Sequence, residues 1–96
     1  MTRLTDPGIP RITYDLTIAK IDGKRAMVAL PVVPENAPYA VREGIARRRI
    51  TALGGRCPCG AEARLAGSPI GLAVDHDSGC PAMDSRLIKA ARRWLA

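Results

Sequence analysis

The chain has little from which to build a hydrophobic core. Aromatic residues make up 3% of its 96 residues, and phenylalanine is absent. A core of Leu, Ile and Val in a chain of this length is thin, and domains of this size often recruit a metal or a disulfide for stability. We therefore expect one small domain that needs a metal ion or a disulfide for stability.

Long hydrophobic segments are also missing. The longest apolar run covers residues 26–33, is interrupted by Pro31, and is too short to span a bilayer. The first ten residues contain no apolar stretch typical of a secretion signal. The sequence thus predicts a soluble, cytoplasmic protein without membrane association.

Cysteine and histidine are scarce, yet all of them fall in two short segments. The chain has three cysteines and one histidine, with Cys57 and Cys59 in CPCG and with His76 and Cys80 in HDSGC. An odd number of cysteines in a reducing cytoplasm argues against a disulfide framework. Extended residues i and i+2 point to the same side, so the cysteines of CPCG can present both sulfurs to one ion.

The gap between His76 and Cys80 is typical of the later ligands in zinc modules. We therefore predict that Cys57, Cys59, His76 and Cys80 bind one structural Zn²⁺ ion as a Cys₃His set. The C-x-C spacing is one residue shorter than the usual C-x₂₋₄-C pair. A chance disulfide or unligated thiols remain as alternatives.

Neighbouring residues are predicted to support this site. Pro81 is a favoured first helical residue, which would make Cys80 the N-cap and direct the amides of the two residues after Pro81 at its sulfur. Asp75 or Asp77 would accept a hydrogen bond from the imidazole N–H that faces away from the metal. The alternative is that these aspartates only form the turn.

The hydrophobic periodicity predicts an α+β fold in a single domain. Alternating apolar residues on both sides of an Asp-Gly turn predict two strands, and apolar residues at helical spacing predict two helices. The expected segments are an irregular lead-in at 1–10, a β-hairpin at 11–35, a helix at 36–53, a zinc knuckle at 54–80 and an amphipathic helix at 81–96. Within the knuckle, residues 61–66 and 72–74 are predicted to be short strands.

Two registers are possible for the hairpin. A two-residue Asp-Gly loop would place Leu16 opposite Ala29 and mix the apolar faces of the two strands. A loop in which Gly23 is the left-handed residue of a bulge would place Leu16 opposite Val28 and keep the apolar positions on one face. We predict the bulged turn.

The ends of the helices carry signals of different strength. Asn36 is a reasonable N-cap for the first helix, and Gly54 would close it. The alternative is that this segment leaves the helix near Arg48 and runs as a short strand into the metal site. The last helix is expected to start at Pro81 or at Asp84.

The pairing of RCPCGAE with HDSGCPA, followed by a short basic helix, resembles the small zinc-knuckle proteins encoded by high-GC actinobacteria and their phages. The CPCG motif itself is similar to a shortened CPxCG knuckle of zinc ribbons. The resemblance covers about residues 50–82, and it implies a structural metal.

No catalytic residues are predicted. Zinc deaminases are the nearest catalytic pattern, but they require H-x-E, P-C-x-x-C and an open coordination position for water. This chain has HDS and PCxC. With every cysteine and the one histidine used as ligands, no position opens for water and no histidine is left as a general base. We expect a protein that is not an enzyme.

The charge of the chain suggests what it binds. The net charge is +6, and it falls to +5 when three thiolates bind one Zn²⁺ ion. The basic residues that we predict to contact nucleic acid are Arg47, Arg48, Arg49, Arg86, Lys89, Arg92 and Arg93. The shortage of aromatic residues favours duplex over single-stranded partners. An alternative for residues 47–49 is a solvated helix end, because consecutive helical residues spread over about 200°.

The predicted function is therefore that of a small, non-catalytic zinc-binding module that associates with nucleic acid in a regulatory role. The alternative is a protein adaptor, in which a hairpin edge or the last helix binds another protein or a second copy of the chain. In that case the zinc only makes the binding surface rigid.

Overall fold

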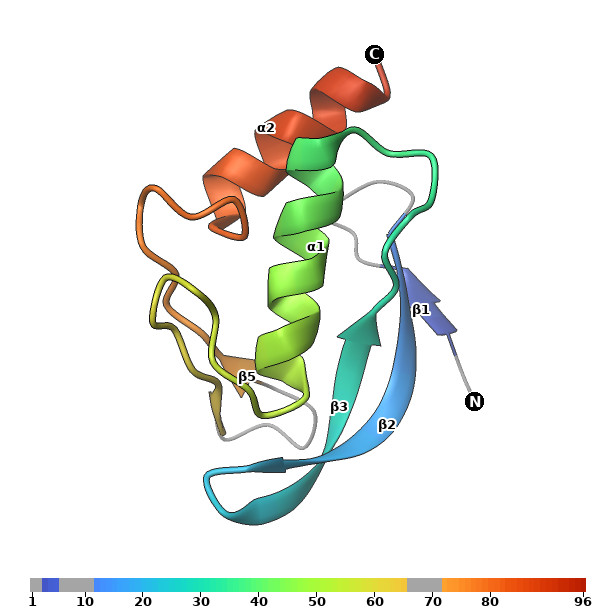
Figure 1. Cartoon of the computed structure of the whole chain (residues 1–96). Coiled ribbons are helices and arrows are strands. Elements are labelled where there is room, and N and C mark those ends of the chain that lie inside the picture. Colours follow the sequence, from blue (N-terminus) through green and yellow to red (C-terminus); the bar gives the residue numbers. More distant parts are fainter. Residues whose placement is uncertain (1–2, 6–11, 66–71) are drawn as a thin grey trace.

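The computed structural model describes residues 3–5, 12–65 and 72–96. It shows an α+β arrangement in which a hairpin sheet, a central helix, a Cys/His region and a C-terminal helix follow one another (Figure 1). The elements are β1 (Arg3–Thr5), β2 (Thr13–Ile21), β3 (Lys24–Pro31), α1 (Tyr39–Ala52), β4 (Arg64–Leu65), β5 (Leu72–Ala73) and α2 (Asp84–Trp94). The predicted fold class is confirmed. Neither helix of the described ranges is long and apolar enough to cross a membrane.

The hairpin has the register that we did not predict. Thr17 lies opposite Val28, and Leu16 lies opposite Ala29. The turn contains two residues, and both have positive φ, 53° at Asp22 and 74° at Gly23. Positive φ at both central residues is the mark of a type I′ turn, whose twist matches that of the strands. The prediction of a bulged turn is therefore wrong.

The register argument failed because β2 buries opposite faces at its two ends. Near its start, Ile12 and Tyr14 pack into a cluster with the helices. Near its end, Ala19 and Ile21 are buried instead, while Ile18 on the other face is 49% exposed. A parity rule assumes that one face is buried along the whole strand, and this strand does not meet that condition.

The lead-in contains a strand. Arg3–Thr5 form β1, which pairs antiparallel with β2, so the strand order is β1-β2-β3. The prediction of an irregular lead-in at 1–10 is wrong for these three residues. Three residues are too few to show a period, and the nearby prolines dominate the sequence signal. A third strand makes β2 central and gives the sheet more independent stability than a two-stranded hairpin has.

The first helix begins later than predicted. Its N-cap position is Pro38, with extended backbone and no capping side chain, so Asn36 is not the cap. Proline biases the preceding residue, here Ala37, toward extended backbone, and this disfavours a helix through residues 36 and 37. The helix therefore starts at Tyr39.

The end of α1 follows the prediction. The helix passes Arg48 without interruption and ends at Ala52, so the alternative strand does not form. The Gly54 amide donates to the Thr51 carbonyl and the Gly55 amide donates to the Ile50 carbonyl, which is a Schellman motif. Gly54 has a φ of 90°, and a Cβ there would collide with the backbone carbonyl of Lys20 at the end of β2.

The last helix is amphipathic, as predicted, but it starts at the later of the two expected residues. The Met83 amide donates to the Cys80 carbonyl (3.1 Å), so residues 80–83 form a turn before α2 begins. Leu87 and Ala91 are fully buried against Val41 and Ile45 of α1. The predicted strands in the knuckle are shorter than expected, and residue 66 lies outside the described residues.

A glycine allows α1 to approach the C-terminal segment closely. A Cβ added at Gly44 would lie 2.6 Å from the Pro81 carbonyl oxygen and 2.8 Å from Leu87 Cδ1. The backbone of Pro81 cannot move away easily, because Cys80 beside it is buried. The contact therefore fixes the distance between α1, the start of α2 and the Cys/His region.

Gly44→Ala is expected to destabilise the protein, although alanine is the better helix former. The added methyl group forces backbones apart, which typically costs about 1–3 kcal/mol. In a domain of this size each kcal/mol lowers the thermal midpoint by roughly 4–8 °C. Gly79→Ala is the control, because a Cβ there meets nothing within 4 Å. A thermal midpoint that rises in Gly44→Ala would contradict the close contact.

Candidate metal centre

Four side chains from two distant turns meet at one point. Cys57, Cys59, His76 and Cys80 each offer one ligand atom, and these atoms lie within 4.8 Å of one another. All three cysteines are free. The structure therefore brings together every residue that the sequence predicted as a metal ligand.

Three of the separations between ligand atoms match tetrahedral coordination of one ion. Cys57 Sγ lies 3.7 Å from Cys80 Sγ, and His76 Nδ1 lies 3.5 Å from Cys59 Sγ and 3.6 Å from Cys80 Sγ. Zinc binds sulfur at about 2.3 Å and nitrogen at about 2.0–2.1 Å, so tetrahedral geometry places two sulfurs about 3.8 Å apart and sulfur and nitrogen about 3.6 Å apart. The four side chains are therefore arranged to bind one metal ion.

The first turn is held by its own backbone. The Cys57 amide donates to the Ala61 carbonyl (2.9 Å), and the Gly60 amide donates to the Cys57 carbonyl (2.8 Å). These bonds fold CPCG into a tight loop with the two sulfurs on one side. Cys57 is only 2% exposed and packs in a cluster with Ala61, Cys80 and Ala82.

The second turn presents His76 and Cys80. The Cys80 amide donates to the Asp77 carbonyl (2.9 Å), which confirms the expected turn between the two ligands. The Ala82 amide donates to Cys80 Sγ (3.4 Å), as predicted. Cys80 is nevertheless not the N-cap of α2, because the next amide binds its carbonyl and the helix starts four residues after it.

The two aspartates beside the histidine have other roles than the predicted one. The Asp75 carboxylate lies 3.7 Å from the Arg64 guanidinium. Asp77 acts through its backbone, since its amide donates a hydrogen bond to the Cys59 sulfur. Neither contact involves the imidazole.

The cysteines differ in acidity because their surroundings differ. Burial raises the pKa of the Cys57 thiol to about 11. The Asp77 amide is the main cause that lowers the pKa of Cys59 to about 6. A metal ion favours the thiolate at every cysteine ligand, because the thiolate is the form that binds.

A positive charge lies beside one of the sulfurs. Arg47 of α1 has its Nη1 atom 3.7 Å from Cys80 Sγ and its Nε atom 3.3 Å from a carboxylate oxygen of Glu43. The hydrogen bond to Cys80 raises the pKa of Arg47 above its ordinary value. Three thiolates around a divalent cation carry one net negative charge, which the Arg47 guanidinium partly offsets. The sequence predicted that Arg47 contacts phosphate, and nothing in it indicated the contact with Cys80.

The next two arginines also contact the protein. Arg48 donates to the Ala82 carbonyl (3.0 Å) and forms an ion pair with Asp84. Arg49 donates to the Pro31 carbonyl at the end of β3 (3.0 Å). Because all three arginines of the RRR run are half-buried, the alternative of a simple solvated helix end is wrong. Their predicted contact with nucleic acid stays a prediction, and phosphate would compete there with these protein groups.

The predicted basic residues of α2 lie apart from this centre. Arg86, Lys89, Arg92 and Arg93 are all exposed on the helix face opposite its buried residues. Arg86 donates one hydrogen bond to the Gly79 carbonyl (2.9 Å). These four side chains therefore carry positive charge that solvent and partners can reach.

Comparison of the chain with protein-family models, curated proteins and solved structures gave no match. The resemblance to actinobacterial and phage zinc-knuckle proteins therefore stays a prediction. The case for a metal site is made by the side-chain geometry.

Arg47→Gln is expected to weaken metal binding about tenfold, a typical loss when a group bonded to a metal ligand is removed. Competition with a chromophoric chelator measures the affinity. Arg42→Gln is the matched control, because Arg42 is exposed on the same helix and its loss changes the charge equally. Equal affinities in the two variants would show that Arg47 has no specific effect on the site.

Proposed function

We propose that the protein is a small, non-catalytic zinc-binding module that associates with nucleic acid in a regulatory role through the exposed basic face of α2. The observation that carries the proposal is the Cys₃His cluster, whose separations suit tetrahedral zinc. Soft thiolate and imidazole ligands select zinc over magnesium or calcium, which prefer oxygen. With three sulfurs and one nitrogen the coordination is complete, so the zinc has no position left for a substrate.

The role of the zinc in this proposal is structural. The buried residues that surround the ligands are few and small, consisting of Ala61 and Ala82 beside Cys57 and Cys80. Structural zinc contributes on the order of 10 kcal/mol, whereas a domain of this size has a total stability of about 5–15 kcal/mol. Metal binding would thus decide whether the segment from residue 50 onward folds.

The purified protein is expected to contain one zinc ion per chain. Elemental analysis against protein concentration measures this ratio. Replacing any one ligand should lower this ratio, in the variants Cys57→Ser, Cys59→Ser, His76→Ala and Cys80→Ser. A strong chelator should unfold α2. It should thereby change the fluorescence of Trp94, which packs against the apolar cluster between the two helices. Freshly reduced protein without zinc, or an unchanged thermal transition after chelation, would refute structural zinc.

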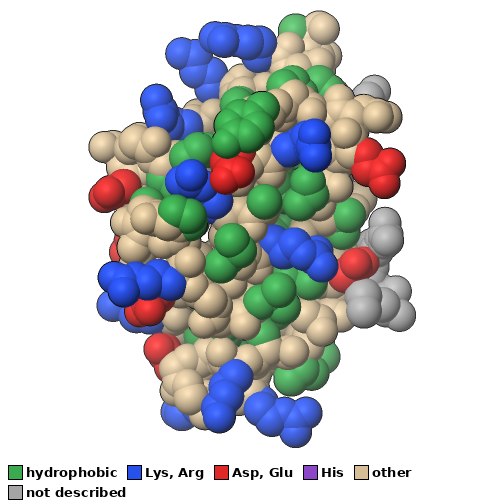
Figure 2. Space-filling model, viewed as in Figure 1, with side chains coloured by type: hydrophobic (Ala, Val, Ile, Leu, Met, Phe, Trp, Pro, Cys, Tyr) green, Lys and Arg blue, Asp and Glu red, His purple; other side chains and the backbone are tan. Residues whose placement is uncertain are grey.

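The support for nucleic acid comes from charge and its placement. Four exposed cations follow one another along α2, whereas the residues on its other face are buried. Figure 2 shows Lys and Arg side chains spread over the face that the two helices form, with hydrophobic side chains between them. Arginine binds phosphate with paired N–H donors. The phosphate backbone, which duplexes and single strands share, is the partner that this face suits.

Replacing Arg86, Lys89, Arg92 and Arg93 together with Gln should weaken binding to duplex DNA and flatten its dependence on salt. Each lost phosphate contact lowers the slope of log affinity against log salt by about 0.9. The matched control replaces Lys20, Lys24, Arg25 and Arg56 with Gln, which removes the same number of exposed charges outside α2. Fluorescence anisotropy at several salt concentrations measures both.

Two results would count against this part of the proposal. If the two quadruple variants lose the same affinity, binding is not localised to α2. If the wild-type protein retains neither DNA nor RNA at low ionic strength, nucleic-acid association fails, and the protein-adaptor interpretation takes its place.

A further inference from the structure

A groove with three cations lies between the two helices. It has a volume of about 580 Å³ and includes Arg86, Lys89 and Arg93 of α2 on one wall. The other wall includes Tyr39 and Ala40 at the start of α1, and Pro81 contributes to the lining. No acidic residue is among the described side chains that line it.

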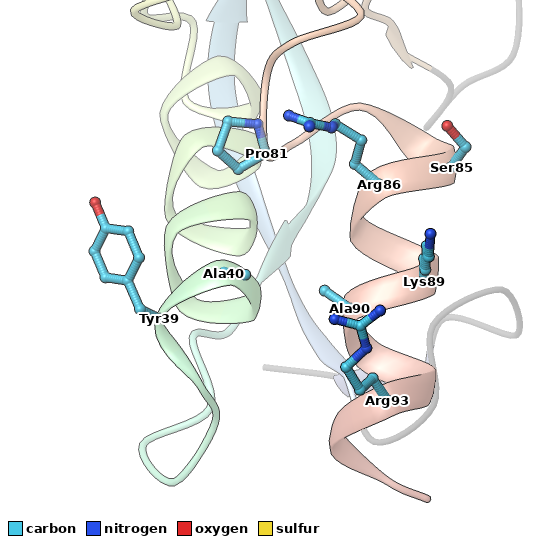
Figure 3. A pocket seen from close by; sticks show the side chains of 8 residues that line it. All are labelled: Tyr39, Ala40, Pro81, Ser85, Arg86, Lys89, Ala90 and Arg93. Atoms are coloured by element: carbon cyan, nitrogen blue, oxygen red, sulfur yellow. The ribbon is translucent and has the colours of Figure 1, made fainter.

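The groove has the size and lining of a ligand site. Its volume falls within the range of about 300–1,000 Å³ that is usual for such sites. Tyr39 is 77% exposed, so most of its side chain is open to a partner. In Figure 3, Arg86 extends from α2 toward the segment with Pro81, Arg93 lies along α2, and the ring of Tyr39 projects from α1 on the side away from α2. All three residues line the groove. An exposed aromatic face and a row of cations therefore border the same hollow.

We propose that this groove binds an unpaired segment of nucleic acid, with phosphates on Arg86, Lys89 and Arg93 and a base stacked on the ring of Tyr39. This inference rests on the proposed function, because it assumes that α2 contacts nucleic acid, and it names the form of nucleic acid that the site takes.

The spacing of the cations indicates a chain of phosphates. Arg86 and Arg93 are seven residues apart on α2, which corresponds to about 10 Å along the helix axis. The two side chains leave the helix at points too far apart for one inorganic phosphate to match their spacing. Successive phosphates of a strand can contact them in turn. Lys89 lies between them on the same face.

The aromatic ring indicates that the strand is unpaired. In a duplex each base is stacked between its neighbours and offers no free face to a protein ring. In a single strand a base can turn out and stack on an aromatic side chain, and such stacking is sequence-tolerant. The expectation of a duplex, drawn from the small number of aromatic residues, did not take into account that one of them borders the basic groove.

The test uses the zinc-loaded full chain and a fluorescent eight-nucleotide thymidine oligomer, with anisotropy as the readout. Tyr39→Ala should weaken binding of this oligomer about tenfold, within the range usual for one stacked base. Tyr39→Phe should bind like the wild type, because it retains the ring. An abasic oligomer with the same phosphates should bind Tyr39→Ala and wild type equally.

The cations are tested with a matched pair. Arg93→Gln should weaken binding of both oligomers more than Arg92→Gln does, because Arg92 is exposed on the same helix but does not line the groove. Tyr39 and both arginines are exposed, so zinc content and the thermal midpoint should stay unchanged in all variants and serve as the folding control.

Three outcomes would overturn the inference. Duplex binding by the wild type with no effect of Tyr39→Ala on the thymidine oligomer would leave the proposed function intact and refute the groove. Competition by octaglutamate at the same concentration as the oligomer would show a site for acidic peptides. Absence of binding to duplex and single strand alike would refute the proposed function together with the inference.

Discussion

Three sulfurs and one imidazole meet at the point where the separate segments of the C-terminal half of the chain come together. This centre joins the loop that contains CPCG to the turn between His76 and Cys80, and the Ala82 amide then binds Cys80 Sγ just before α2 begins. Arg47 reaches the same sulfur from α1. One small centre thus joins α1, the CPCG loop and the segment before α2, and it adds to the apolar packing between the two helices.

Charge inside this fold serves two separate purposes. The three consecutive arginines of α1 bind a sulfur, two carbonyl groups and two carboxylates, so they connect α1 to the metal centre, to the start of α2 and to the end of β3. The cations of α2 stay in solvent. A net charge counted from the sequence does not distinguish these purposes, since the RRR run is counted among the 15 basic residues in the same way as the cations of α2. A partner can reach the exposed cations of α2 and those of the hairpin turn, whereas the RRR run is largely occupied by contacts within the protein.

The metal ligands could be predicted from the sequence because their chemistry is local. Cys57 and Cys59 adopt a suitable arrangement through the backbone around Pro58, and the turn between His76 and Cys80 is encoded by adjacent residues. The strands, the helices and the end of α1 at Gly54 likewise follow from short-range patterns. These features need only a few neighbouring residues to be specified.

The errors arose where distant segments decide the outcome. The hairpin register depends on which face of β2 is covered at each end. The helices cover one face near its start, and residues of the knuckle cover the other face near its end. β1 is defined by its pairing with β2, and the contact between Arg47 and Cys80 joins residues 33 positions apart. In the sequence, Gly44 is only a residue of low helix propensity. The structure shows that it allows the backbone of Pro81 to lie close to α1. None of these contacts leaves a periodic signal in the chain.

The apolar cluster under the hairpin takes members from both halves of the chain. Ala19, Ile21 and Val28 pack with Ala63, and Leu72 and Val74 lie against them. The Leu65 amide also donates to the Asp22 carboxylate in the hairpin turn (3.3 Å). The hairpin and the metal-binding region therefore share an apolar cluster, which couples the stability of the strands to that of the metal-binding region. Hydrogen exchange at the amides of β2 and β3 would report loss of the metal, although neither strand contributes a ligand.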